Sequence, residues 1–172
     1  MKIALIGYMG SGKSTVGVLL AERLKLPLID LDNYIEDEEG RSISEIFELK
    51  GEIYFRKKER FYLDQICNES RPMILSVGGG TPVYGNNMEV INNAFTSVYL
   101  RANVPTLLKR LSVNRQSRPL ISRINNADLG EFIGKHLFER QNFYQKSQIV
   151  IDVNNLSEEE CTNLIVKELP EH

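Results

Sequence analysis

The sequence contains few of the residues that cross-link small proteins through sulfur or metal ions. Its two cysteines, Cys67 and Cys161, lie far apart with no CxxC pair, and its two histidines are His136 and His172. Zinc sites and disulfide frameworks need more such residues at closer spacing. The composition therefore argues against a zinc site and a disulfide scaffold, and it favours a reducing compartment, the cytoplasm.

Long apolar runs are missing as well. No run approaches the roughly 20 residues that a membrane-spanning helix requires. The opening residues, MKIALIGYMG, hold one lysine and four consecutive apolar residues, too few for the core of a secretory signal. We therefore expect no association with a membrane.

Acidic residues are absent between Glu89 and Asp128, although the same stretch contains the cations Arg101, Lys109, Arg110, Arg115, Arg118 and Arg123. The whole chain carries a net charge of −2, which argues against a dedicated nucleic-acid binder. A basic stretch within a mildly acidic chain favours a local anionic ligand. The alternative is a solvated basic helix face.

The 172 residues correspond to one domain. Helical patterns alternate with five short apolar segments, which predict strands at 3–6, 28–31, 73–77, 97–100 and 148–152. Ser42 and Glu45 have the spacing of a capping box, so we expect a short helix that ends near Gly51 and a longer one at 52–68. This alternation predicts an α/β fold, a parallel sheet with helices on both faces.

Half of the twelve glycines lie in two clusters, and the first of these carries a nucleotide-binding motif. Gly7-Tyr-Met-Gly-Ser-Gly-Lys-Ser14 matches G-x-x-x-x-G-K-[ST] between a predicted strand and a predicted helix. Glycines let backbone N–H groups surround a phosphate, the lysine reaches the β- and γ-phosphates, and the hydroxyl is placed for Mg²⁺. We therefore predict an ATP site formed by Gly10, Ser11, Gly12, Lys13, Ser14 and Thr15.

Two acidic residues follow the second predicted strand. Side chains alternate along an extended segment, so Asp30 and Asp32 are expected on one side, facing the ligand crevice of a parallel sheet. One carboxylate can help to hold hydrated Mg²⁺ while the other accepts a hydroxyl proton. The alternative is that Asp32 caps a following helix. A guanine-nucleotide switch is not indicated, because N-K-x-D is absent.

Two further features suggest an acceptor pocket. Arg56 and Glu59 are three residues apart on a predicted helix, so the glutamate can orient the guanidinium. The cluster Gly78–Gly80 follows a strand and would allow its backbone to approach a small ligand. An ordinary surface ion pair and a flexible turn are the respective alternatives.

Taken in order along the chain, these features resemble the shikimate kinase family over essentially the whole length. The matching set comprises the P-loop (Gly7–Ser14), Asp30-x-Asp32, Phe55-Arg56-x-x-Glu59, Gly78-Gly79-Gly80, Arg118-Pro119-Leu120 and Arg140-x-x-x-Tyr144. The resemblance implies a three-layer α/β/α P-loop kinase fold, like that of nucleoside monophosphate kinases, with a central five-stranded parallel sheet and a mobile lid. It also implies Mg²⁺-dependent transfer of the ATP γ-phosphoryl group to the 3-hydroxyl of shikimate, on the route to chorismate and aromatic amino acids, by a monomer.

The same resemblance implies a role for each matching residue. Asp32 would bind the shikimate hydroxyls and act as the base, and Asp30 with Ser14 would lie at the Mg²⁺. Arg118, in the lid, would approach the transferring phosphoryl group together with Lys13. The substrate-binding set would be Asp32, Arg56, Gly78, Gly79, Gly80 and Arg140. A single kinase domain at 1–172 would include a substrate-binding segment at about 31–60 and a lid at about 111–124.

The chain departs from the family pattern in places. Val77 precedes the glycine triplet where a small hydroxyl residue is common, and Asn142 replaces a frequent proline. Either Arg110 or Arg115 can stack on adenine, and Arg110 can equally be a helix C-terminal cation. Two other functions stay open: a related gluconate-kinase-like or nucleotide-kinase-like enzyme, and a nucleotide-binding module without turnover.

Overall fold

The computed structural model describes residues 1–113, 121 and 124–170. Each of the predicted strands is present, and no end differs by more than one residue from its expected position. The elements are β1 (Lys2–Ile6), α1 (Lys13–Leu24), β2 (Leu28–Asp30), α2 (Leu31–Glu39), α3 (Ile43–Asn68), β3 (Met73–Ser76), the 3₁₀ turn η1 (Thr81–Val83), α4 (Asn87–Ala94), β4 (Thr96–Arg101), α5 (Val104–Val113), α7 (Asn126–Tyr144), β5 (Ile149–Asp152) and α8 (Glu158–Glu168).

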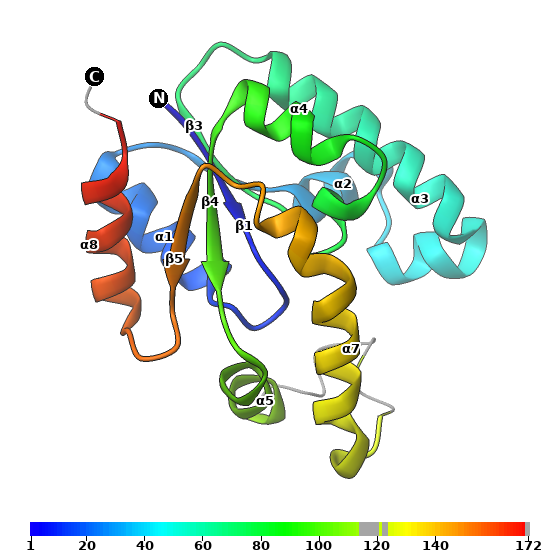
Figure 1. Cartoon of the computed structure of the whole chain (residues 1–172). Helices are drawn as coiled ribbons and strands as arrows, with labels where there is room; N and C mark the ends of the chain where they lie inside the picture. Colours follow the sequence, from blue (N-terminus) through cyan, green and yellow to red (C-terminus); the bar gives the residue numbers. More distant parts are fainter. Residues whose placement is uncertain (114–120, 122–123, 171–172) are drawn as a thin grey trace.

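The strands form one sheet in the order β2-β3-β1-β4-β5, and every neighbouring pair is parallel. Ile3 of the central strand pairs with Ile74 on one side and Thr96 on the other. Figure 1 shows the sheet between α1 and α8 on one side and α3, α4 and α7 on the other. The predicted α/β architecture with a five-stranded parallel sheet is therefore confirmed.

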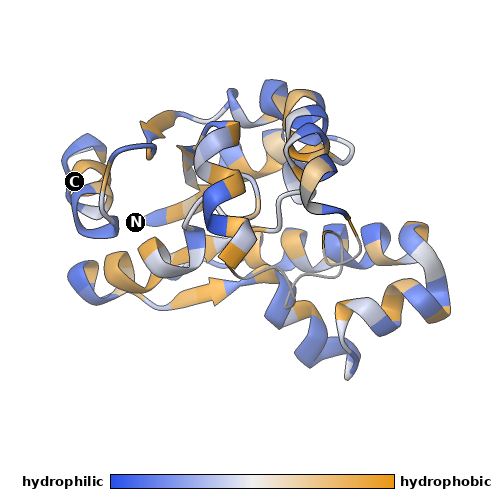
Figure 2. Cartoon of the chain, turned by 90° about the horizontal axis from the view of Figure 1, so that it is seen from below, coloured by the Kyte–Doolittle hydropathy of each residue, from blue (hydrophilic) through white to orange (hydrophobic). Residues whose placement is uncertain are grey.

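Apolar side chains explain why these segments form a covered sheet. Residues Ile3–Ile6 of β1 and Met73–Leu75 of β3 are completely buried, as expected for parallel strands that helices cover on both faces. Figure 2 shows apolar positions along the strands and polar positions on the outward faces of the helices. Among the described residues, no helix is both long enough and apolar enough to cross a bilayer.

Helix α2 was considered only as the alternative in which Asp32 caps a following helix, because the acidic run at its end obscured its pattern. The helix is held to α3 by Glu39, which accepts hydrogen bonds from the hydroxyls of Tyr54 and Tyr62, each at 2.7 Å, and pairs with Lys58 at 2.8 Å. The Lys58 hydrogen bond, together with the two tyrosines, lowers the pKa of Glu39 to about 2. Since α2 follows β2 directly, this contact fixes α3 relative to the end of the sheet.

The two helices expected on either side of Gly51 form one element with a break. Ser42 and Glu45 make the predicted capping box, and Gly51 takes φ 80° and ψ 171°, which are not helical values. The second half of α3 then runs beside α4 (Figure 1). Arg56 and Glu59 lie in that half, close to the carboxyl ends of the strands.

Candidate active site

The P-loop (Gly7–Ser14) joins the buried strand β1 to α1, and its glycines adopt backbone conformations that other residues rarely take. Gly10 has a φ of +81° and Gly12 a φ of +102°, in the left-handed region where a Cβ atom is unfavourable. Gly12 is the N-cap of α1, which begins at Lys13. The N–H groups at a helix start, together with the helix dipole, make this turn suited to bind a phosphate.

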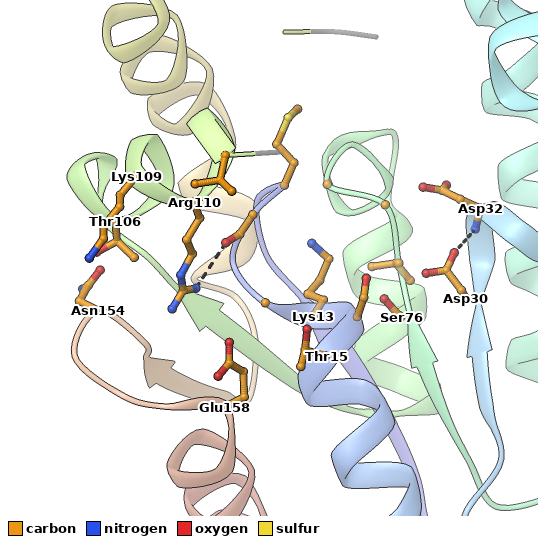
Figure 3. A pocket seen from close by; sticks show the side chains of 18 residues that line it. Lys13, Thr15, Asp30, Asp32, Ser76, Thr106, Lys109, Arg110, Asn154 and Glu158 are labelled. Carbon is orange, nitrogen blue, oxygen red and sulfur yellow. Dashed lines mark hydrogen bonds between the residues drawn. The ribbon is translucent and has the colours of Figure 1, made fainter. Parts of the chain in front are cut away.

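Lys13 is held across the mouth of the P-loop. Its Nζ atom donates hydrogen bonds to the carbonyl oxygens of Gly7, at 2.7 Å, and Tyr8, at 3.1 Å. Figure 3 shows its side chain between Arg110 on one side and Asp32 on the other. The ammonium group therefore lies where it can contact phosphates bound by the loop.

A cavity of about 670 Å³ opens at the carboxyl ends of the strands. This volume lies in the range of small-molecule sites, and the location is the usual one for ligands of open α/β sheets. Figure 3 shows acidic Asp30 and Asp32 on one side of Lys13 and a polar, basic group on the other. That second group consists of Thr106, Lys109, Arg110 and Asn154, with the carboxylate of Glu158 beside it.

Asp30 and Asp32 both line the cavity, but the predicted local structure was wrong. Strand β2 ends at Asp30, and Leu31 begins α2, so Asp32 lies in the first turn of a helix and not on an extended segment. Asp30 Oδ1 accepts hydrogen bonds from the backbone N–H groups of Asp32, at 3.0 Å, and Asn33, at 3.2 Å. The N-cap is therefore Asp30, and a helical turn, not strand alternation, places both carboxylates at the cavity.

The surroundings of Asp32 disfavour its negative charge. Burial raises the pKa of its carboxyl group from 3.8 to about 6, the charges of Asp30 and Glu59 act in the same direction, and those of Lys13 and Arg56 oppose them. A carboxyl group with this pKa is ionised at pH 7 but accepts a proton more readily than an ordinary aspartate. Such a group is suited to general base catalysis near neutral pH.

Arg56 and Glu59 form a buried ion pair, so the alternative of an ordinary surface pair is wrong. Arg56 Nη1 lies 2.8 Å from Glu59 Oε2, and the side chains are 15% and 1% exposed. Arg56 Nε lies 3.5 Å from the more exposed Glu52. Glu59 thus orients the guanidinium group, whose Nη2 atom is the one closest to where a Cβ atom on Gly80 would lie.

The glycine triplet Gly78–Gly80 provides room for three charged side chains. A Cβ atom on its first residue would lie 3.0 Å from Asp32 Oδ1, on the second 3.3 Å from Arg140 Nη1, and on the third 2.6 Å from Arg56 Nη2. None of the three glycines has a positive φ, so the requirement is space and not backbone conformation. The triplet is the point at which Asp32, Arg56 and Arg140 converge.

Arg140 comes from α7, far along the chain from the P-loop, and two contacts hold its helix in place. The Tyr144 hydroxyl donates a hydrogen bond of 2.6 Å to the carbonyl oxygen of Gly79. The Tyr8 hydroxyl lies 2.9 Å from His136 Nδ1, and the Arg140 guanidinium lies 6.0 Å from the centre of the Tyr8 ring. One face of α7 is therefore fixed to both glycine clusters.

Arg110 was one of two arginines considered for contact with adenine. It lies in the last turn of α5, and its Nη1 atom donates to the carbonyl oxygens of Ser11, at 3.0 Å, and Gly10, at 3.3 Å. Its Nη2 atom donates to the carbonyl oxygen of Val153 at 3.3 Å. The guanidinium group therefore forms part of the cavity wall behind the P-loop. Arg115 lies outside the described residues.

Ser14 and Thr15 line the cavity beside Lys13, whereas Arg118 lies outside the described residues. Val77, which replaces a common hydroxyl residue, lines the cavity together with Ser76, so a hydroxyl group is present one residue earlier.

Sequence reasoning missed Thr106, Asn154 and the contacts of Tyr8. No local pattern marks Thr106 or Asn154. Thr106 lies near the start of α5 and Asn154 lies two residues after β5, and only the fold brings them to the cavity. Tyr144 could have been predicted to support Arg140, since residues four apart lie on one helix face.

Comparison with known proteins gives the family. A family model described as Shikimate kinase matches residues 9–170 of this chain. The chain belongs to the shikimate kinase family. A shikimate kinase of Flavobacterium psychrophilum is 44% identical over 154 residues, which cover 88% of this chain and 90% of that protein.

Solved shikimate kinases share the same architecture. The crystal structure of the Bacteroides thetaiotaomicron enzyme superposes with a TM-score of 0.90 at 32% identity and covers 98% of this chain and 99% of its own. The Acinetobacter baumannii shikimate kinase in complex with shikimate gives a TM-score of 0.86 at 30% identity and covers 96% and 90%. As a shikimate kinase, the chain is an ATP-dependent phosphotransferase with an alcohol acceptor.

Proposed function

We propose that the chain transfers the γ-phosphoryl group of ATP to the 3-hydroxyl of shikimate at this cavity, with Asp32 as the base. The observation that carries the residue assignment is the convergence of Asp32, Arg56 and Arg140 on the triplet Gly78–Gly80, beside the P-loop. This arrangement places a base and two cations next to a phosphate-binding turn. A small polyol carboxylate matches such a set, because it offers hydroxyls to the base and a carboxylate to the cations.

The two arginines would hold the substrate carboxylate. Arg56 is already oriented by Glu59 and lies against Gly80, and Arg140 lies against the neighbouring Gly79. Charge-assisted hydrogen bonds of this kind contribute about 1.5–3 kcal/mol each. With the carboxylate held, the ring would lie against Gly79 and Gly80, and its hydroxyls would face Asp32.

Asp32 would accept the proton of the attacking hydroxyl. Its raised pKa of about 6 makes proton transfer to it more favourable than to an ordinary aspartate. Lys13 and the N-terminus of α1 would neutralise the charge of the phosphates, and Arg118 would approach the transferred group from the proposed lid at about 111–124. Phosphoryl transfer depends mainly on such positioning and neutralisation.

The cavity also fits a magnesium ion bound together with ATP. Mg²⁺ in kinases takes one or two protein ligands, with phosphates and water completing its shell. The Ser14 hydroxyl and the Asp30 carboxylate line the same cavity, and no cluster of three acidic, histidine or cysteine side chains suited to an all-protein metal cage occurs in the described part of the chain. Ser14 would hold the ion directly and Asp30 through water, and the ion would neutralise phosphate charge.

The adenine ring would lie at the opposite end of the cavity from Asp32. Thr106, Arg110 and Asn154 line that end, and the Arg110 guanidinium is kept in place by its hydrogen bonds to the P-loop carbonyls. A planar guanidinium held in this way offers a flat surface for stacking on a purine.

A coupled ADP-release assay tests the proposed function. The purified chain is supplied with ATP and Mg²⁺ and with shikimate, gluconate or nucleoside monophosphates as acceptor. We expect turnover that depends on shikimate and is at least about a hundredfold slower with the other acceptors. Nucleoside monophosphates carry no carboxylate for the two arginines, and open-chain gluconate does not hold its carboxylate and its hydroxyls in the fixed geometry of a ring. Absence of shikimate-dependent ADP release would overturn the proposal. Size-exclusion chromatography of the same sample checks the expected monomer.

A further inference from the structure

The ion pair of Arg56 is connected to a buried polar network beyond the cavity. Glu59 is 1% exposed, and its two carboxylate oxygens have different partners. Oε2 lies 2.8 Å from Arg56 Nη1, while Oε1 accepts a hydrogen bond of 2.6 Å from the Thr81 hydroxyl. A buried carboxylate is costly unless its oxygens are hydrogen-bonded, so the Thr81 hydroxyl is a substantial part of what holds Glu59.

Thr81 is itself fixed through every polar group it has. It is completely buried, and its backbone N–H donates to the carbonyl oxygen of Gly78 at 3.1 Å. Its own carbonyl oxygen accepts a hydrogen bond of 2.9 Å from Asn87 Nδ2. Asn87 is also completely buried, and its Oδ1 atom accepts from Arg60 Nη1 at 3.2 Å. Thr81 therefore connects the glycine triplet, the start of α4 and the buried carboxylate of α3.

We propose that Thr81 is a positioning residue for substrate recognition: its hydroxyl sets the Glu59–Arg56 pair of α3 against the glycine triplet, and Asn87 holds Thr81 in the conformation that this requires. The inference rests on the proposed role of Arg56 as a ligand of the substrate carboxylate.

The position of Arg56 relative to the glycine triplet has to be fixed by a contact between elements. Arg56 and the triplet belong to different elements, and the guanidinium lies so close to the triplet that a Cβ atom on Gly80 would be 2.6 Å from Nη2. A shift of Glu59 by a fraction of an ångström would move the guanidinium toward or away from that surface. The Thr81 hydroxyl bonds Glu59, and the Thr81 backbone N–H bonds Gly78. One residue therefore holds both the Glu59–Arg56 pair and the glycine triplet.

The test is Thr81→Val, which keeps the shape of the side chain and removes the hydroxyl donor. Loss of one hydrogen bond to a charged group, at about 1.5 kcal/mol, should raise KM for shikimate about tenfold, while KM for ATP stays within about twofold. Thr81→Ser restores a hydroxyl and should recover most of the affinity. Thr162→Val is the matched control, because Thr162 is equally buried but its hydroxyl donates to a carbonyl of its own helix, that of Glu158, at 2.8 Å.

A double-mutant cycle tests whether the effect passes through Arg56. In an Arg56→Ala background the Thr81→Val change should alter kcat/KM for shikimate by less than about twofold, because the group it positions is gone. If Thr81→Val does not yield folded protein, Asn87→Ala should raise KM for shikimate in the same direction by a smaller factor.

Three outcomes would overturn this inference. They are an unchanged KM for shikimate in folded Thr81→Val, an equal rise in KM for both substrates, and a full additional loss in the Arg56→Ala background. The proposed function fails separately, through absence of shikimate-dependent turnover in the wild-type chain.

Discussion

Replacing Asp32 by asparagine should abolish catalysis and make the protein more stable. The carboxylate occupies a site that disfavours its charge, since burial and two neighbouring carboxylates raise its pKa from 3.8 to about 6. Asparagine has nearly the same shape and no charge. The substitution therefore separates the two consequences of the raised pKa, a base suited to neutral pH and a strained folded state.

The magnitude follows from the pKa itself. The rise in pKa from 3.8 to about 6 means that the ionised carboxylate lowers the free energy of unfolding by about 3 kcal/mol. Each pKa unit is worth about 1.4 kcal/mol. We expect Asp32→Asn to raise the free energy of unfolding by about 3 kcal/mol at pH 7.5, or Tm by about 6–12 °C.

The dependence on pH identifies the cause. A carboxyl group whose pKa is higher in the folded state destabilises the fold fully above the folded pKa and not at all below the unfolded pKa. The stability gain of Asp32→Asn should therefore be complete above pH 7, fall to about half at pH 5 and to about a fifth at pH 4. Over the same range kcat/KM of the wild-type chain for shikimate should decline as pH falls through about 6.

Urea unfolding at pH 7.5 and pH 5, with Asp37→Asn as control, measures the effect. Asp37 lies on the same helix but is exposed, so its substitution should change the free energy of unfolding by less than about 0.5 kcal/mol. The reasoning is refuted if Asp32→Asn is no more stable than the wild-type chain at pH 7.5. It is refuted equally if the gain is the same at both pH values, or if turnover with shikimate persists at the wild-type rate.

Two further changes test the carboxylate site by steady-state kinetics. Arg140→Ala should raise KM for shikimate at least about tenfold through loss of a charge-assisted hydrogen bond and leave KM for ATP nearly unchanged; equal changes in the two constants would contradict the assignment. Gly80→Ala places a Cβ atom 2.6 Å from Arg56 Nη2, so KM for shikimate should rise about tenfold if displacement of the guanidinium weakens a charged hydrogen bond. Gly134→Ala, where the nearest atom lies 3.9 Å away, should leave that KM as it was.

Most of the fold could be predicted because the strands are apolar and the three central ones, β1, β3 and β4, are almost entirely buried. The segment containing Ile3–Ile6, which is completely buried, can be recognised as a strand from its apolar residues alone. This does not require knowing which strands it pairs with. Helix α2 could not be predicted in this way, since only Leu31 and Ile35 of its nine residues are buried and its acidic end suits a loop equally well. As a result, the reason given for the closeness of Asp30 and Asp32 was wrong, although both do line the cavity.

The sequence alone determined the phosphate-binding half of the site. The P-loop is contiguous, and its chemistry depends on backbone conformations that glycine permits locally at Gly10 and Gly12. The acceptor half was decided by tertiary structure. Arg56, Glu59, Thr81 and Arg140 have ordinary local sequences, and their burial, their separation and the raised pKa of Asp32 arise only where α2, α3, α7 and the glycine triplet meet. Charge burial depends on everything packed around a group, and that information lies in no single segment of the chain.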